Sequence, residues 1–479
     1  MNYRMIINVL GRVLMAIAAL MLLPLIVGLC CGESILNFLL TILATGGLGF
    51  LMYLIKPKTK KLFAREGFAI VGFSWLLMSL LGALPFVISG DIPNYIDAVF
   101  ETASGFTTTG ASIVNNVELM TRGCLFWRMF THWIGGMGML VFIMAVMPMS
   151  GEHSMHIMRA EVPGPTVGKL VPRVKKTAMI LYMIYFGLTI LETVFLLCGG
   201  MSFYDAVTHA FATAGTGGFS TRAASIGGFN SLYVEIVMAT FMVLFGINFN
   251  LYFLILIGKW KTALGSEELH VFFVILVAAV LGISANIAGM YGSYGTALRH
   301  AYFNVTSIIS TAGFGTEDFT RWPAFSQWIL VMLMFVGGCA GSTGGGLKLS
   351  RVMLIVKAVV ADVRQMLFPR RVAVVKLDGK RVEDGIVRAA YTHFALYMVL
   401  LIGTAFLLSI DGNDVLTNFT AAISAMSNVG PGLGKIGPAG NFNVFSYPSK
   451  VVLTLAMLLG RLEIYPLLVL VFPDMWKRK

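Results

Sequence analysis

Four short stretches rich in glycine, serine and threonine recur along the sequence, and their backbone could replace the water around a cation. The first, from Ala103 to Ser112, reads Ala-Ser-Gly-Phe-Thr-Thr-Thr-Gly-Ala-Ser and is anchored on Gly110. Related stretches surround Gly217, Gly313 and Gly430. The anchors lie about 100 residues apart, which indicates a four-fold internal repeat.

Each stretch closes a mildly apolar segment of helical length, and the four segments begin near Asp97, Asp205, Arg299 and Asn418. They are far shorter than the ~20 residues that a membrane-spanning helix needs. A short helix that runs into a glycine-bearing strand is typical of an ion-channel pore loop, in which backbone carbonyl groups replace the water around a dehydrated cation. Glycine permits the required backbone angles, and serine and threonine add hydroxyl oxygens. A single stretch could be an ordinary loop or a helix contact, but four in register favour pore loops.

A fifth unusual stretch, Gly337 to Gly346, reads Gly-Gly-Cys-Ala-Gly-Ser-Thr-Gly-Gly-Gly and falls inside a predicted span. Each glycine costs about 1 kcal/mol relative to alanine in a helix, so the span should be interrupted here. Irregular backbone at membrane depth is tolerated where it lines a cavity or is buried in protein. The segment resembles a phosphate-binding loop only superficially, because Gly346-Leu347-Lys348 lacks the Gly-Lys-Ser/Thr of that motif.

One arginine, Arg461, falls inside the last predicted span. A charge at that depth costs a few kcal/mol, so the side chain should face water or a partner. Glu463 is not an obvious local partner, because helix positions two apart point in different directions. An ion pair between helices and a pore-facing role both remain open.

Composition places these stretches in a membrane protein. The 479 residues are 57% hydrophobic and only 12% charged, with a mean hydropathy of +0.82, which excludes a soluble globule. The formal net charge of +12 could suggest a nucleic-acid partner, but the basic residues follow membrane topology, so we predict none. Five cysteines without CxxC spacing predict neither a disulfide framework nor a metal site.

Hydropathy predicts ten spans, the first of them retained rather than cleaved. The first two form an N-terminal hairpin outside the repeat, and each repeat then reads span, short pore helix, glycine stretch, span. The predicted units are 1–66 for the hairpin and 67–176, 177–267, 268–387 and 388–479 for repeats 1 to 4. The predicted spans are about 5–29, 36–55, 67–89, 125–148, 177–199, 231–258, 268–291, 326–357, 388–409 and 449–472.

The basic residues give the orientation. Most of the 35 lysines and arginines lie on the side of the two termini, which the positive-inside rule makes cytoplasmic, so the glycine stretches enter from outside. The basic loops near 56–65 and 364–381 either set topology against anionic lipid or bind a cytosolic partner. The second includes a predicted small hairpin near 372–380. The seven basic residues on the outer side are Arg122, Arg128, Arg222, Arg299, Arg321, Lys435 and Lys450.

These motifs resemble the Trk/Ktr/HKT superfamily of cation uptake proteins over essentially the whole chain. The N-terminal hairpin is more similar to the Trk branch than to the shorter Ktr branch. The matching segments are Ser104-Gly105-Phe106-Thr107-Thr108-Thr109-Gly110-Ala111, Thr216-Gly217-Gly218-Phe219-Ser220, Asn428-Val429-Gly430-Pro431-Gly432-Leu433-Gly434, the run Gly337 to Lys348, and Arg461.

The resemblance implies an all-α polytopic subunit in the inner membrane of a prokaryote, with four pseudo-symmetric repeats around a central pore. It implies uptake of K⁺ by a homodimer with one pore per protomer, no enzyme activity and no organic cofactor. It also implies a cytosolic ring of nucleotide-binding regulatory subunits. Selectivity should rest on backbone carbonyls, because Ala312 and Val429 make the ring chemically unequal. The implied filter residues are Thr108, Thr109, Gly110, Thr216, Gly217, Thr311, Ala312, Gly313, Asn428, Val429 and Gly430. The implied gate residues are Gly337, Gly338, Gly341, Ser342, Thr343, Gly344, Gly345, Gly346, Lys348 and Arg461.

Two other classes of membrane protein are alternatives. A sodium-permeable or cation-coupled secondary transporter would be expected to show inverted repeats and membrane-embedded acids. Here the units repeat in one orientation, and Glu463 is the only clear acid within a predicted span. A membrane enzyme would need clustered titratable residues on the spans, and the sequence shows none.

Overall fold

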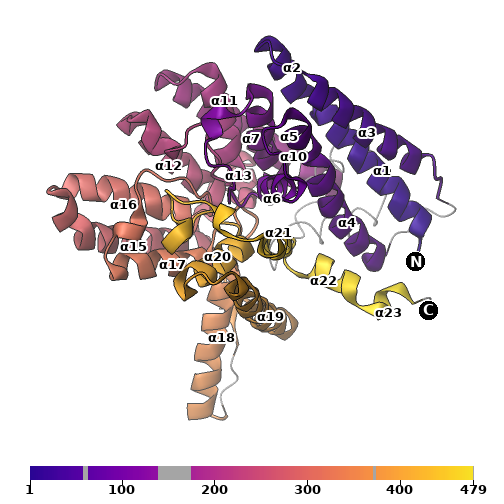
Figure 1. Ribbon diagram of the computed structural model, residues 1–479. Coiled ribbons are helices and arrows are strands. Elements are labelled where there is room, and N and C mark those ends of the chain that lie inside the picture. The colour runs from indigo at the N-terminus through magenta and orange to yellow at the C-terminus, as the bar shows by residue number, and fades with distance from the viewer. Residues whose placement is uncertain (58–62, 139–173, 371–373, 478–479) are drawn as a thin grey trace.

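The computed structural model describes residues 1–57, 63–138, 174–370 and 374–477, and this part of the chain is mostly helical, with one two-stranded hairpin (Figure 1). This confirms the all-α prediction. The described residues include six short 3-10 helices: η1 (Val117–Leu119), η2 (Ser225–Phe229), η3 (Phe319–Arg321), η4 (Ser409–Asp411), η5 (Gly434–Ile436) and η6 (Phe442–Val444). The α-helices are α1 (Tyr3–Leu20), α2 (Leu22–Cys30), α3 (Leu36–Tyr53), α4 (Ala64–Gly82), α5 (Leu84–Ser89), α6 (Tyr95–Phe106), α7 (Arg122–Gly136), α10 (Val174–Cys198), α11 (Phe203–Ala214), α12 (Leu232–Gly246), α13 (Phe249–Leu256), α14 (Trp260–Leu264), α15 (Glu267–Tyr291), α16 (Tyr294–Ile309), α17 (Ala324–Val336), α18 (Leu349–Leu367), α19 (Asp384–Leu408), α20 (Val415–Ser427), α21 (Tyr447–Arg461), α22 (Tyr465–Val471) and α23 (Pro473–Trp476).

The N-terminal hairpin of α1 to α3 lies at one edge of the molecule (Figure 1). A Cβ atom on Gly11 would lie 2.5 Å from the Gly49 carbonyl oxygen, so α1 and α3 cross closely only because both positions lack a side chain. The C-terminal helices return to the same region, where the rings of Tyr3 and Trp476 stack with centroids 6.4 Å apart. The two ends of the chain therefore lie on one side of the bundle (Figure 1).

Four short helices, α6, α11, α16 and α20, occupy the positions of the predicted pore helices. Capping side chains hold the N-termini of α6, α11 and α20: Asn94 accepts from the N–H of Ile96, Ser202 from the N–H of Asp205 and Asp414 from the N–H of Thr417. The helices begin at Tyr95, Phe203, Tyr294 and Val415, which is two to five residues earlier than predicted. In α6, α11 and α20 the caps explain the difference, because the polar capping residues precede the apolar periodicity from which the starts were predicted.

A second helix follows each short helix and packs against both its own short helix and that of the next repeat. Thus α7 contacts α6 and α11, α12 contacts α11 and α16, α17 contacts α16 and α20, and α21 contacts α20 and closes the circle on α6. Each of these helices therefore lies at a boundary between successive repeats.

The second spans are less regular than hydropathy predicted. Among the described residues six helices are long and apolar enough to cross a membrane, and α12 with α13 forms a seventh candidate that bends by 88°. The break at 337–348 was predicted from its glycines, but continuous spans at 231–258 and 449–472 are wrong, since the chain breaks between α12 and α13 and between α21 and α22. Residues 139–148, which form the end of the span predicted at 125–148, lie outside the described residues.

On the side of α18, two strands form the predicted hairpin. Strands β1 (Lys376–Leu377) and β2 (Lys380–Arg381) pair antiparallel, and Val382 N–H donates to the Val375 carbonyl at 2.9 Å. The strands are shorter than the predicted segment 372–380, and residues 372 and 373 lie outside the described part. Helix α18 itself extends away from the bundle (Figure 1).

Candidate functional site

Each short helix ends in the same backbone turn, in which an N–H donates to the carbonyl five residues earlier. The residue just before each of these N–H donors has a left-handed backbone: φ is 56° at Thr108, 54° at Thr216, 60° at Thr311 and 53° at Asn428. Non-glycine residues adopt this conformation at some energetic cost, so its repetition indicates a common geometry. The four donor and acceptor pairs are Thr109 to Ser104 (2.9 Å), Gly217 to Ala212 (2.8 Å), Ala312 to Ser307 (2.8 Å) and Val429 to Ser424 (3.0 Å).

This turn corrects the register of the second repeat. Two residues after the left-handed position, φ is positive again at Gly110, Gly218, Gly313 and Gly430, with values of 77°, 78°, 77° and 101°. The structural counterpart of Gly110 is therefore Gly218, and the anchor predicted at Gly217 is wrong by one residue. Thr216 corresponds to Thr108, and Gly217 takes the place of Thr109, Ala312 and Val429.

The four turns meet in a closed ring, which we call the glycine ring. A Cβ atom on Gly110 would lie 1.9 Å from the Gly217 carbonyl oxygen, and one on Gly218 would lie 2.2 Å from that of Ala312. A Cβ atom on Gly313 would lie 2.2 Å from the Val429 oxygen, and one on Gly430 would lie 2.7 Å from the Thr109 oxygen. Every ring glycine thus packs against the carbonyl of the neighbouring repeat, where no side chain fits.

The electrostatics of the ring favour a cation. The C-terminal ends of α6, α11, α16 and α20 lead into it, and the end of a helix carries a partial negative charge. A cavity of about 160 Å³ opens against it, lined by the four ring glycines and by further residues that include Arg128 and Asn441. At the far end of α20, hydrogen bonds from the Thr417 hydroxyl and N–H hold the pKa of Asp414 below its usual value. That carboxylate therefore caps the helix N-terminus in its charged form.

The segment Gly337 to Lys348, which we call the glycine loop, packs against the turns of repeats 3 and 4. Gly345 N–H donates to the Thr311 hydroxyl at 2.7 Å, and a Cβ atom on Gly345 would lie 2.1 Å from the Ser427 carbonyl oxygen. Likewise, a Cβ atom on Gly344 would lie 2.8 Å from the Ser310 carbonyl oxygen. The loop therefore touches the left-handed residues on which the ring is built.

Neighbouring helices hold the glycine loop from its other side. Cys339 N–H donates to the Gly246 carbonyl at 3.0 Å, at the break between α12 and α13. Glu268 accepts from Ala340 N–H at 2.7 Å, and Lys348 donates to the Gly344 carbonyl within the loop. The predicted gate residues Gly337, Gly338, Gly341, Ser342, Thr343, Gly344, Gly345, Gly346 and Lys348 all lie in this one compact segment.

Arg461 is the last residue of α21 and reaches the glycine loop. Its guanidinium donates to the Thr343 carbonyl at 2.7 Å and to the carbonyls of Gly135 and Gly136 at 2.6 and 2.7 Å. Because the chain breaks after it, Arg461 does not sit in the middle of a continuous span as predicted. Glu463 lies beyond the break and forms an ion pair with Arg351 of α18. Arg461 therefore joins the loop to the C-terminal end of α7.

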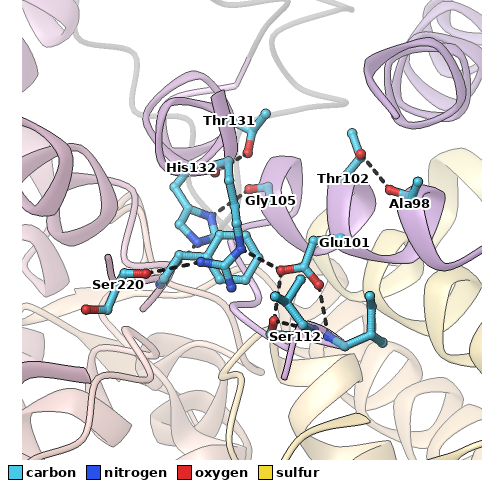
Figure 2. Close-up of polar contacts among 12 residues, drawn as sticks. Ala98, Glu101, Thr102, Gly105, Ser112, Thr131, His132 and Ser220 are labelled. Carbon is cyan, nitrogen blue, oxygen red and sulfur yellow. Dashed lines mark hydrogen bonds and ion pairs between the residues drawn. The ribbon is translucent and has the colours of Figure 1, made fainter. Parts of the chain in front are cut away.

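Sequence reasoning missed a buried polar cluster behind the ring. Arg128 was counted only as an outer charge, but its side chain is 3% exposed and donates to Glu101 at 2.6 Å. His132, one turn further along α7, is fully buried and contacts the Gly105 carbonyl (Figure 2). The spacing of four between Arg128 and His132, matched by that between Glu101 and Gly105, was the available signal.

A buried acid in α10 was also missed in the sequence. Glu192 and Glu235 lie within the predicted spans 177–199 and 231–258 and are buried, so the prediction that Glu463 is the only clear acid within a span is wrong. Both carboxylate oxygens of Glu192 lack a hydrogen-bond donor in the described part of the chain. The hydroxyl of Thr213 lies nearby but donates to the His209 carbonyl at 2.9 Å. This acid packs behind the short helix of repeat 2.

Taken together, the helical fold, the glycine ring and the glycine loop define a multi-pass membrane protein of the cation-transport class. A family profile, TrkH, described as a cation transport protein, matches residues 33–478, and the chain belongs to that family. It is 35% identical to the Trk system potassium uptake protein TrkH of Halomonas elongata over 484 residues, with all of both chains covered. It is 34% identical to the Trk system potassium uptake protein TrkG of Escherichia coli, with 89% of this chain and 88% of that protein covered. The crystal structure of the potassium transporter TrkH from Vibrio parahaemolyticus matches all of both chains with a TM-score of 0.90 and 32% identity.

Proposed function

We propose that this protein takes up potassium ions across the inner membrane of a bacterium, through a selectivity filter formed by the glycine ring. The observation that carries the proposal is the closed circle in which each ring glycine packs on a carbonyl of the next repeat. Relatives of full length are named potassium uptake proteins, which supports K⁺ as the transported ion. K⁺ is here the cargo of the protein.

The proposed ion ligands are the backbone carbonyls of the residues that precede the ring glycines. Thr109, Gly217, Ala312 and Val429 share a backbone geometry but differ in side chain, so hydroxyl groups cannot form a symmetric set. Discrimination against Na⁺ would then depend on the field and spacing of the carbonyls. Small displacements of one repeat would alter it.

The glycine loop and Arg461 form the proposed gate. The loop lies against the ring turns of repeats 3 and 4, and Arg461 fixes it to α7 through the Thr343 carbonyl. A positive charge beside a narrow passage repels cations. Release of the Arg461 contacts would free the loop, whose glycines allow many backbone conformations.

Control from outside the chain is a further part of the proposal. With both termini cytoplasmic, α18 and the β1–β2 hairpin would face a cytosolic nucleotide-binding subunit, and two copies of the chain would form a dimer. Helix α18 continues directly from the glycine loop at Leu349 and carries Arg351, which pairs with Glu463. A partner that binds α18 could therefore move the loop.

A second candidate, cation-coupled secondary transport, is kept because of Glu192. A buried carboxyl group without a donor is costly as an anion, and membrane-embedded acids commonly carry protons in coupled transporters. If Glu192 carried the coupling proton, Glu192→Gln would abolish the dependence of uptake on a proton gradient. Channel-like flux would not depend on a proton gradient in the wild type or in the Glu192→Gln variant.

Rubidium and sodium flux into proteoliposomes tests the proposal, with and without a proton gradient. Gly110→Ser and Gly313→Ser should each shift the rubidium-to-sodium ratio toward sodium or abolish rubidium uptake. Gly403→Ser is a matched control, because a Cβ atom there has open space around it. An unchanged ratio in both ring variants would remove the filter from the glycine ring.

A further inference from the structure

The four helices that lie at the repeat boundaries share a register, and α7 differs from the other three. We number each helix from the residue that precedes it, taken as position zero. Positions seven and eleven are then polar only in α7, where they are Arg128 and His132. All eight side chains are buried. The corresponding pairs are Met238 and Met242 in α12, Leu330 and Met334 in α17, and Leu453 and Met457 in α21.

Arg128 connects the short helix of repeat 1 to the ring strand of repeat 2. Its Nε donates to Glu101 at 2.6 Å, its Nη1 donates to the Ser220 carbonyl at 3.4 Å, and its Cζ lies 3.4 Å from the centre of the Phe219 ring. Glu101 also accepts from the Ser112 hydroxyl at 2.9 Å (Figure 2). A buried ion pair with further hydrogen bonds is costly to break from one side, because the remaining charge is left without a partner.

His132 makes the second connection between the same two repeats. Its Nδ1 lies 2.8 Å from the Gly105 carbonyl oxygen, and its Nε2 lies 3.4 Å from the Phe219 nitrogen. A neutral imidazole protonated on Nδ1 donates to Gly105 and accepts from the Phe219 N–H, so one tautomer satisfies both contacts. The residue that provides this N–H directly follows the ring glycine Gly218.

The imidazole also explains why Gly217 has no side chain. A Cβ atom on Gly217 would lie 2.3 Å from Nδ1 of His132. In the other repeats this ring position carries a side chain, as Thr109, Ala312 or Val429, and position eleven of the boundary helix is methionine. At the boundary between repeats 1 and 2, α7 therefore carries the imidazole of His132, and the ring residue Gly217 carries no side chain.

We propose that Arg128 and His132, with Glu101 and Gly105 as their acceptors, are positioning residues that fix the ring strand of repeat 2 and thereby set cation discrimination. We call these four residues the ladder. The inference rests on the proposed function of the glycine ring. It identifies α7 as the helix that places the Gly217 carbonyl, through Phe219 and Ser220 on the same strand. Because Arg461 binds the carbonyls of Gly135 and Gly136 at the end of α7, the ladder and the glycine loop share one helix.

The test replaces residues at the boundary between repeats 1 and 2 by the residue types found at the boundary between repeats 2 and 3. His132→Met should change the rubidium-to-sodium uptake ratio by roughly three- to tenfold, the effect of about one lost hydrogen bond. Gly217→Ala alone should reduce rubidium uptake by roughly tenfold or more, because its methyl group meets the imidazole. The double variant His132→Met/Gly217→Ala matches the pairing of Met242 with Ala312 and should recover uptake to within about threefold of the wild type, the range left by a volume-conserving exchange.

Flux is measured per folded protein, as judged by size-exclusion chromatography. Met238→Leu is the matched control, because it exchanges the boundary residue of α12 at constant volume and should leave the ratio unchanged. If His132→Met does not fold, the double variant Arg128→Met/Glu101→Gln removes the other connection without leaving a charge unpaired, and it must shift the ratio. An unchanged ratio in the folded ladder variants, or a His132→Met/Gly217→Ala protein no more active than Gly217→Ala, overturns the ladder.

The outcomes separate the ladder from the filter. If Gly110→Ser and Gly313→Ser shift the ratio but the ladder variants do not, the filter stands and the ladder is only structural. If the two ring variants leave the ratio unchanged, the proposed filter itself fails.

Discussion

The glycine ring and the glycine loop are both rich in glycine, but the structure uses the residue differently in each. In the ring, one turn is repeated four times, and every glycine packs against a neighbouring carbonyl. The loop occurs once, in repeat 3, and is held by single contacts from several elements, among them Thr311, Glu268 and Arg461. The ring is fixed by mutual packing around a closed circle. Loop glycines such as Gly345 also pack on a carbonyl, but the loop depends in addition on hydrogen bonds from single side chains, which can be released one at a time. This difference suits the proposed rigid filter and the proposed movable gate.

The largest expected effect comes from a side chain in the ring. Gly313→Ser would place a Cβ atom 2.2 Å from the Val429 carbonyl oxygen at a position whose φ is 77°. Overpacking of this kind costs at least 1–3 kcal/mol, which corresponds to a loss of roughly tenfold or more in potassium uptake. Uptake by cells that depend on this protein for growth at low potassium provides the measurement. Wild-type growth of Gly313→Ser cells would contradict a rigid ring.

The next largest expected effect is an increase in potassium flux rather than a loss of uptake. Arg461→Ala removes the hydrogen bonds to Thr343, Gly135 and Gly136, and deletion of 344–346 shortens the loop itself. Both changes should raise potassium flux in the absence of a regulator by roughly fivefold or more, because even one lost hydrogen bond of about 1 kcal/mol corresponds to about fivefold.

Flux per folded protein in liposomes distinguishes the gate from a packing role. If the loop only supports the fold, both variants should lower the yield of folded protein. Values at or below the wild type in well-folded variants of both kinds would leave the loop without a gating role.

A smaller effect is expected at the far end of α18 and at the β1–β2 hairpin, which we propose face the cytosol. Neutralisation of Arg370, Lys380 and Arg381, together with Arg371, which lies outside the described residues, should weaken co-purification with a regulatory subunit. Exposed charge pairs contribute about 0.2–1 kcal/mol each, so the affinity should fall roughly two- to fivefold per pair lost. The remaining binding should depend less on salt concentration. Unchanged affinity and salt dependence would assign these residues to membrane topology alone.

The smallest effect on transport is expected far from both regions. Gly11→Ala places a methyl group 2.5 Å from the Gly49 carbonyl oxygen in the N-terminal hairpin. It should lower the thermal unfolding temperature while leaving the potassium-to-sodium ratio unchanged, because the hairpin lies outside the ring. A shifted ratio in this variant would show that selectivity is not confined to the glycine ring.

The sequence by itself determined the features that depend on local composition. Long apolar runs predicted membrane helices, since burial in lipid requires them, and the clustered glycines of 337–346 predicted an interrupted span. The four-fold recurrence of short helix and glycine was visible because a turn with left-handed residues restricts the residue types that can form it. The β1–β2 hairpin followed from the same local reasoning, through Asp378 and Gly379 at its turn.

Tertiary structure decided the features that depend on contacts distant in sequence. Two adjacent glycines, Gly217 and Gly218, made the register ambiguous, and only the backbone turn and the neighbouring carbonyl of Ala312 resolved it. The ladder joins Arg128 to Glu101 and to Ser220, 27 and 92 residues away, and Arg461 reaches Thr343 across 118 residues. Hydropathy gives the depth of a charged residue in the membrane but not its partner. The partner is set by how the repeats close around the ring, because only that packing brings these groups within hydrogen-bonding distance.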